Sequence, residues 1–171
     1  MLKKEPMGAY EIQQLVEYRS LSKWIKVSTP SIYKKALQLE EKGFIRGTTL
    51  REGKMPEKVV YSLTEAGEAE FVRLMQETAA RPIHFFLDCN AVVVNLEHLP
   101  LAAQADCLDK IGRSLQALKH SLEENLAAKQ DLPDVPQNGL AVLRQQLLLA
   151  QAMEQWLAAL RETLPGEAAS K

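Results

Sequence analysis

Polar and cationic side chains recur every three or four residues in one short stretch of the chain: Ser31, Lys34, Lys35, Gln38 and Lys42. If the stretch is helical, this spacing places them on one face. Hydroxyl, amide and ammonium groups hydrogen-bond to phosphates and to base edges in the major groove of DNA. The stretch therefore predicts a helix whose face contacts duplex DNA. A lysine-rich face that is merely solvated is the alternative that these residues alone leave open.

Signals at both ends predict that this helix spans residues 29–42. Ser28 or Thr29 can cap the first backbone N–H groups, and Pro30 suits the first helical position. Gly43 can end the helix in a left-handed conformation. The opposite face is expected to point inward and carries Ile32, Ala36, Leu39 and, beside them, Leu37.

The charges along this helix are also arranged as DNA binding requires. The positive N-terminal end of the helix, near Thr29 and Ser31, can face phosphate. Glu40 and Glu41 are kept to the other end. From the residues alone, the Tyr33 side chain could either pack in the core or donate its hydroxyl to phosphate.

A hairpin follows the helix. Residues 44–49 and 58–63 are rich in β-branched and aromatic side chains and predict two strands. The connection between them contains glycine and proline and is expected to form a charged tip. Its cations, expected to reach the DNA backbone or minor groove, are Arg51, Lys54 and Lys58.

The order of predicted elements in residues 1–80 is that of a winged helix-turn-helix. A helix over residues 9–19 precedes the DNA-contacting helix, and between them Trp24 is expected to anchor a turn by packing. After the hairpin, Thr64 can cap a further helix that runs to about Ala80. Helix, turn, helix, two-stranded wing and helix together predict a DNA-binding domain.

Residues 81–171 predict a second, helical domain, so the fold class is mainly α. We expect helices over residues 83–96, 100–129 and 140–164, with a loop at 131–139. Leucines in the two longer helices step by three and four residues, a spacing typical of helices that pack on another helix. We interpret this as a dimerisation domain whose contacts are Leu108, Ile111, Leu115, Leu118, Leu122, Leu143, Leu147, Trp156 and Leu160.

Charge separates the two predicted domains. Residues 19–58 hold 10 lysines and arginines against 4 acidic residues, a net +6, whereas residues 68–171 carry a net −5. This asymmetry favours an anionic partner for the first domain only; chance clustering on a solvated surface is the alternative. No apolar run approaches the roughly 18 residues of a membrane span, and the N-terminus lacks a secretion signal. We therefore expect a cytoplasmic protein with no membrane partner.

The sequence offers no positive reason to expect catalysis. It contains no glycine-rich phosphate loop, nucleophile elbow or paired-carboxylate motif. Cys89 and Cys107 lie far apart and show no metal-ligand spacing with His84, His98 or His120. We interpret the cysteines as buried side chains or free surface thiols rather than as a metal or redox site. The expectation is a protein that is not an enzyme and has no metal and no cofactor.

Three motifs resemble the PadR-type regulators, the phenolic acid decarboxylase regulator family. They are the opening Pro6–Ile12, the segment from Ser31-Ile32-Tyr33 to Gly43-Phe44-Ile45, and the wing with its exit, Lys54–Gly67. More weakly, Phe85-Phe86, Leu99-Pro100 and Gln155-Trp156-Leu157 resemble the family's virulence-activator-like C-terminal domain.

The resemblance implies a homodimer that binds a pseudo-palindromic operator and usually represses, in some members until a small aromatic ligand releases the DNA. Carried over by position, its DNA contacts are Thr29, Ser31, Tyr33, Lys34, Lys35, Lys54 and Lys58. For a ligand pocket, His84, Phe86 and Trp156 are candidates by residue type alone, and packing is the favoured interpretation for them.

One feature of the family is largely missing here, because only Met1–Glu5 precede the motif where the family has an apolar helix. Either the start was assigned late or a part was lost. We expect C-terminal helices, those of a partner chain included, to cover the apolar side chains of Ile12, Leu15 and Leu37. The rival to a DNA-binding regulator is a winged domain that binds a protein partner and has no specific DNA role.

Overall fold

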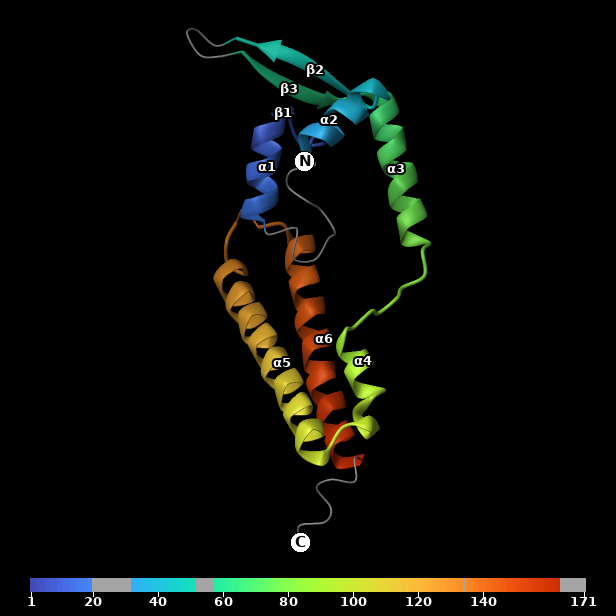
Figure 1. Cartoon of the computed structure of the whole chain (residues 1–171). Helices are drawn as coiled ribbons and strands as arrows, with labels where there is room; N and C mark the ends of the chain where they lie inside the picture. Colours follow the sequence, from blue (N-terminus) through green and yellow to red (C-terminus); the bar gives the residue numbers. More distant parts are fainter. Residues whose placement is uncertain (20–31, 52–56, 134, 164–171) are drawn as a thin grey trace. The chain divides into compact units, whose positions relative to one another are not determined.

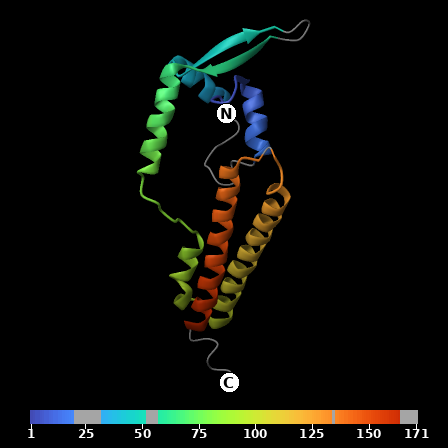
Figure 2. The same ribbon diagram turned by 180° about the vertical axis from the view of Figure 1, so that it is seen from behind.

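The structure is a computed structural model that describes residues 1–19, 32–51, 57–133 and 135–163. The chain divides into two units, Met1–His84 and Phe85–Lys171. The elements of both units are labelled in Figure 1 and seen from behind in Figure 2.

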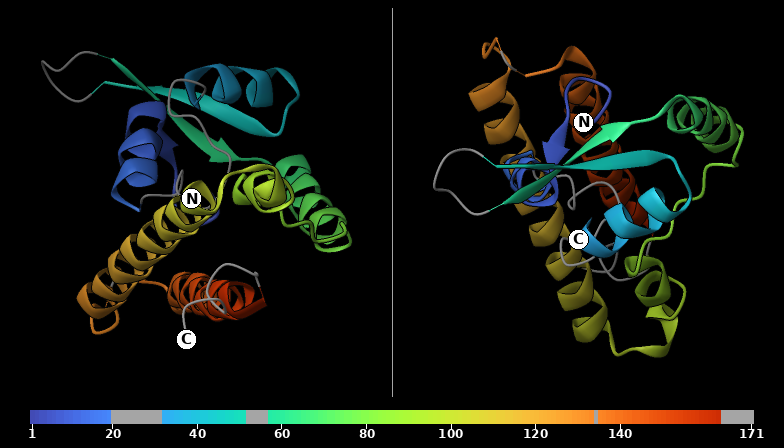
Figure 3. Two further views of the ribbon diagram at one scale, coloured as in Figure 1. Left: turned by 60° about the horizontal axis from the view of Figure 1, so that its bottom comes forward. Right: turned by 90° about the horizontal axis from the view of Figure 1, so that it is seen from above.

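The N-terminal unit is a winged helix-turn-helix, as the sequence predicts. Its elements are β1 (Met7–Gly8), α1 (Ala9–Tyr18), α2 (Ile32–Glu41), β2 (Ile45–Leu50), β3 (Lys58–Leu63) and α3 (Glu65–Ala79). The sheet is antiparallel in the order β1-β3-β2, and the hairpin of β2 and β3 extends away from α3 (Figure 3). The strand β1 was not predicted, because two residues are too few to show an alternating pattern.

The core of this unit joins α1 and α2 to the sheet. Its buried side chains are Ala9, Val16, Ile32, Ala36, Ile45 and Tyr61, with Met1, Leu2, Ile12 and Leu63 packed against them. Met1 and Leu2 thus cover part of the surface that was expected to lack a partner. Each large aliphatic side chain fully buried here contributes roughly 1.5–3 kcal/mol.

The inward face of α2 is narrower than predicted. Ile32 and Ala36 are buried, but Leu37 is 56% exposed and Leu39 is 38% exposed. Successive helical residues are turned by about 100° from each other, so Leu37 points well away from Ala36. The prediction that Leu37 and Leu39 point into the core was therefore wrong for the packing within one chain.

The C-terminal unit consists of α4 (Cys89–Val93), the short 3-10 helix η3 (Leu96–His98), α5 (Leu101–Lys129) and α6 (Gln137–Thr163). The prediction of one helix over residues 83–96 was wrong, since residues 82–87 are not helical. Their apolar side chains have no 3.6-residue period, and richness in apolar residues alone does not indicate a helix. The start of α6 lies three residues before the predicted one.

The two long helices pack on each other along their leucines (Figures 1 and 2). Leu108, Leu115 and Leu157 are buried in one cluster with Leu96, and Ile111, Met153 and Leu160 pack against it. Two ion pairs link the helices, Lys119 Nζ to Glu154 Oε2 and Arg161 Nη2 to Asp109 Oδ1, each 2.8 Å long. Part of the predicted dimer seam is therefore used within a single chain. Among the described residues, no helix is long and apolar enough to cross a bilayer.

Candidate nucleic-acid interface

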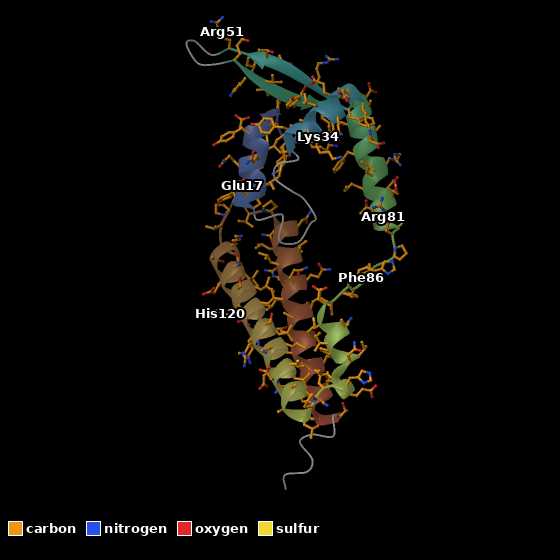
Figure 4. All side chains as sticks on the ribbon, in the orientation of Figure 1. Glu17, Lys34, Arg51, Arg81, Phe86 and His120 are labelled. Atoms are coloured by element: carbon orange, nitrogen blue, oxygen red, sulfur yellow. The ribbon has the colours of Figure 1, made fainter. Side chains whose placement is uncertain are left out.

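The helix α2 presents its cationic face to solvent. The side chains of Lys34 and Lys35 are exposed and Gln38 is half-buried, while Ile32 and Ala36 hold the opposite face in the core. Figure 4 locates Lys34 on this helix. Tyr33 is 52% exposed, so it does not pack in the core of the unit. The exposed groups are donors of the kind that contact phosphate and base edges.

Several predicted contacts lie outside the described residues. These are Thr29 and Ser31 at the start of the helix and Lys54 in the wing, together with the capping and anchoring residues Ser28, Pro30 and Trp24.

The C-terminal end of α2 is fixed by a left-handed glycine and by a threonine. Gly43 has φ of 72°, and its N–H donates to Glu40 O (2.8 Å) while Phe44 N–H donates to Leu39 O (2.9 Å). The hydroxyl of Thr64 donates toward Gly43 O, at 2.7 Å, and Phe44 O, at 3.1 Å. The same oxygen accepts the N–H of Gly67 at 3.0 Å. This one side chain caps α3, as predicted, and also ties α3 to the turn after α2.

No side chain fits at Gly67. A Cβ there would overlap the carbonyl oxygen of Phe44. The first turn of α3 therefore lies directly against the turn that ends α2, and the position of one helix constrains the other.

The cations of the wing have different surroundings. Arg51 is exposed at the end of β2 (Figure 4). Lys58 Nζ lies 3.5 Å from Glu11 Oε1, and Glu11 Oε2 accepts the N–H of Gly8 at 2.7 Å. The Gly8 N–H and the nearby ammonium lower the pKa of the Glu11 carboxyl. Lys58 is thus paired with α1 in the free protein.

A further exposed cation belongs to strand β2 of the wing. Arg46 points outward from β2, next to the buried Ile45. The alternation of an apolar and a charged residue at the start of a strand is the signal in the sequence that could have found it.

The three residues considered for a ligand pocket are divided between the two units. Trp156 is 36% exposed on α6, and Phe86 is 89% exposed; His84 belongs to the other unit. A shallow hollow of about 470 Å³ beside α5 and α6 is lined instead by Asp109, Gly112, Arg113, Gln116, Glu154, Leu157, Ala158 and Arg161.

A winged helix-turn-helix with an exposed cationic helix is an arrangement typical of domains that bind nucleic acid. Residues 1–73 match the model of the transcriptional regulator PadR-like family. The match covers most of the N-terminal unit, and it agrees with the resemblance seen in the motifs of that unit. Proteins of this family are regulators rather than enzymes.

Solved structures share this fold over nearly the whole chain. PadR of Bacillus subtilis in complex with operator DNA has a TM-score of 0.74 at 20% identity, covering 92% of this chain and 91% of that one. The same protein with p-coumaric acid has a TM-score of 0.71 at 19% identity, covering 92% and 90%. The virulence activator AphA of Vibrio cholerae has a TM-score of 0.63 at 19% identity, covering 93% and 90%. No curated protein sequence matches the chain significantly.

Proposed function

We propose that the chain is a sequence-specific DNA-binding regulator whose helix α2 enters the major groove. The observation that carries this proposal is the exposure of Tyr33, Lys34 and Lys35 on a helix that the buried Ile32 and Ala36 hold in the core. The net +6 of residues 19–58 supports it, because cations near the duplex release counterions from the phosphates. A similar fold in Bacillus subtilis PadR carries operator DNA. DNA binding also supports the predicted cytoplasmic location.

The regulator acts as a homodimer on a pseudo-palindromic operator. Once the core of the C-terminal unit is formed, α5 and α6 still expose Leu118 (49%), Leu148 (65%) and Trp156 (36%). Packing such surfaces across a two-fold axis buries both copies. It also holds two recognition helices about 34 Å apart, the distance between successive major grooves.

The regulatory outcome is repression, because a dimer bound at an operator excludes other proteins from that site. A small aromatic effector relieves it by changing the packing of the C-terminal unit and hence the spacing of the two recognition helices. The p-coumaric acid complex of Bacillus subtilis PadR supports an effector of this chemistry. A promoter fusion measured with and without the protein tests the sign of regulation.

Selection of bound duplexes from a random pool at physiological salt tests the whole proposal. We expect a palindromic consensus and an affinity that falls steeply as salt rises. If no sequence is enriched, the chain is instead a winged module that binds a protein partner.

A further inference from the structure

An acidic side chain lies on the helix that we propose to meet DNA, where a free carboxylate would repel phosphate. Glu40 belongs to the last turn of α2, but its carboxylate is turned toward the wing. Glu40 Oε1 accepts the backbone N–H of Gly47, in β2, at 2.7 Å. The side chain is half-buried, whereas that of its neighbour Glu41 is exposed.

The sheet leaves a donor for this carboxylate to bind. Strand β2 is at the edge of the sheet order β1-β3-β2, so the N–H groups on its outer side have no neighbouring strand. The Gly47 N–H is satisfied by Glu40 instead. A hydrogen bond to an ionised carboxylate is shorter and roughly twice as strong as one between neutral groups.

A side chain at position 47 would crowd the Glu40 carboxylate and its neighbours. A Cβ at Gly47 would lie 2.7 Å from Glu40 Oε1, 2.9 Å from Val59 Cγ1 and 3.2 Å from a ring carbon of Tyr61. Glycine therefore lets the carboxylate reach the backbone of the strand.

We propose that Glu40 is a positioning residue that sets the direction of the wing relative to α2. Only Glu41–Phe44 separate the helix residue from the start of β2, and this link includes the left-handed Gly43. Without the tie from Glu40 to Gly47, the hairpin could pivot about this turn. With it, the Lys34 face of α2 and the Arg51 end of β2 meet one duplex together. This inference rests on the proposed DNA-binding function.

The test compares four variants of the full chain: Glu40→Ala, Glu40→Asp, Glu40→Gln and Glu41→Ala. Fluorescence anisotropy gives the affinity for the selected operator and for a random duplex. Exchange of the Gly47 amide proton with solvent, followed by NMR in the absence of DNA, reports on the hydrogen bond between Gly47 and Glu40. Glu41→Ala is the matched control, because it removes the same charge one residue further along the same helix.

We expect Glu40→Ala to lower the ratio of operator to random affinity about tenfold and to speed Gly47 exchange about tenfold. Glu40→Asp keeps the charge but shortens the reach by one methylene, so it should also lower the affinity ratio and speed Gly47 exchange, as Glu40→Ala does. Glu40→Gln keeps an acceptor oxygen and should restore most of the ratio. Glu41→Ala should change neither the affinity ratio nor the Gly47 exchange rate. Loss of its charge should at most tighten binding to both duplexes slightly and equally.

The inference is overturned if Glu40→Ala and Glu41→Ala have the same specificity ratio, or if Gly47 exchange does not change. If Glu40→Ala does not fold, the comparison of Glu40→Asp with Glu40→Gln decides, and equal ratios for these two overturn it. If the wild-type chain selects no operator, the proposed function itself fails, a result that no Glu40 variant can produce.

Discussion

The proposed binding of α2 to DNA should depend on the charges of two neighbouring side chains. Changing Lys34 and Lys35 together to glutamate should weaken operator binding by roughly tenfold for each lysine and lower the salt dependence. Both side chains are exposed, so the thermal unfolding temperature and the oligomeric state should not change. Anisotropy at several salt concentrations and sedimentation measure these quantities.

Lys110→Glu in the C-terminal unit is the control for this pair. It also reverses an exposed charge, one that is paired with Asp106, and should leave operator binding unchanged if the lysines act by contact. Equal losses from both changes would mean that only total charge matters.

A single methyl group at Gly67 should destabilise the N-terminal unit. Gly67→Ala would place its Cβ onto the carbonyl oxygen of Phe44, and relieving such an overlap costs about 3 kcal/mol. Urea unfolding followed by circular dichroism measures the loss. Gly139→Ala is the matched control, because a Cβ there meets nothing within 4 Å and alanine in α6 should gain about 0.5–1 kcal/mol. Equal stability of the two variants would contradict the close approach of α3 to the end of α2.

The junction of α1 with β3 should make the N-terminal unit sensitive to acid. The N–H of Gly8 and the ammonium of Lys58 hold the pKa of Glu11 below its ordinary value of 4.5. The carboxylate therefore adds stability that is fully present above pH 4.5 and is lost as the pH falls through the lowered pKa of the folded state.

Glu11→Gln tests this acid sensitivity, because the amide cannot titrate. The variant should unfold at a lower temperature than the wild type at pH 7, and the difference should narrow toward pH 3. Thermal unfolding across this range is the measurement. A difference that stays constant with pH would show that the Glu11 charge does not contribute.

Most elements could be predicted from the sequence because their signals are local. The spacing in α1, the β-branched and aromatic residues of β3 and the Thr64 cap of α3 each lie within a few residues. The region between α3 and α4 could not, since a short apolar run has the same composition in a helix, a strand or an extended segment. The partner of a strand such as β1 lies more than fifty residues away.

The assembly of the whole molecule should depend on the apolar side chains left exposed by the C-terminal unit. Leu118→Glu should shift the proposed dimer toward monomer and weaken operator binding, because a buried unpaired carboxylate is costly at an interface. Leu118 is 49% exposed, so the protomer itself should stay folded. Sedimentation velocity over a range of concentrations measures the change.

Leu132→Glu provides the comparison, because Leu132 is 48% exposed but lies between α5 and α6, outside the predicted dimer contacts. It should leave the oligomeric state unchanged. If Leu118→Glu also remains a dimer, this part of α5 does not form the interface.

Sequence periodicity and charge determined that this chain has a winged helix with a cationic face, followed by long helices with leucine stripes. A periodic pattern shows that a face is apolar, but it does not show what covers that face. Only the tertiary structure decided that Leu108 and Leu115 pack against α6 of the same chain, while Leu118 stays exposed. It also decided that Glu40 binds the backbone of β2, because this contact depends on the turn at Gly43 and not on the identity of the residue alone.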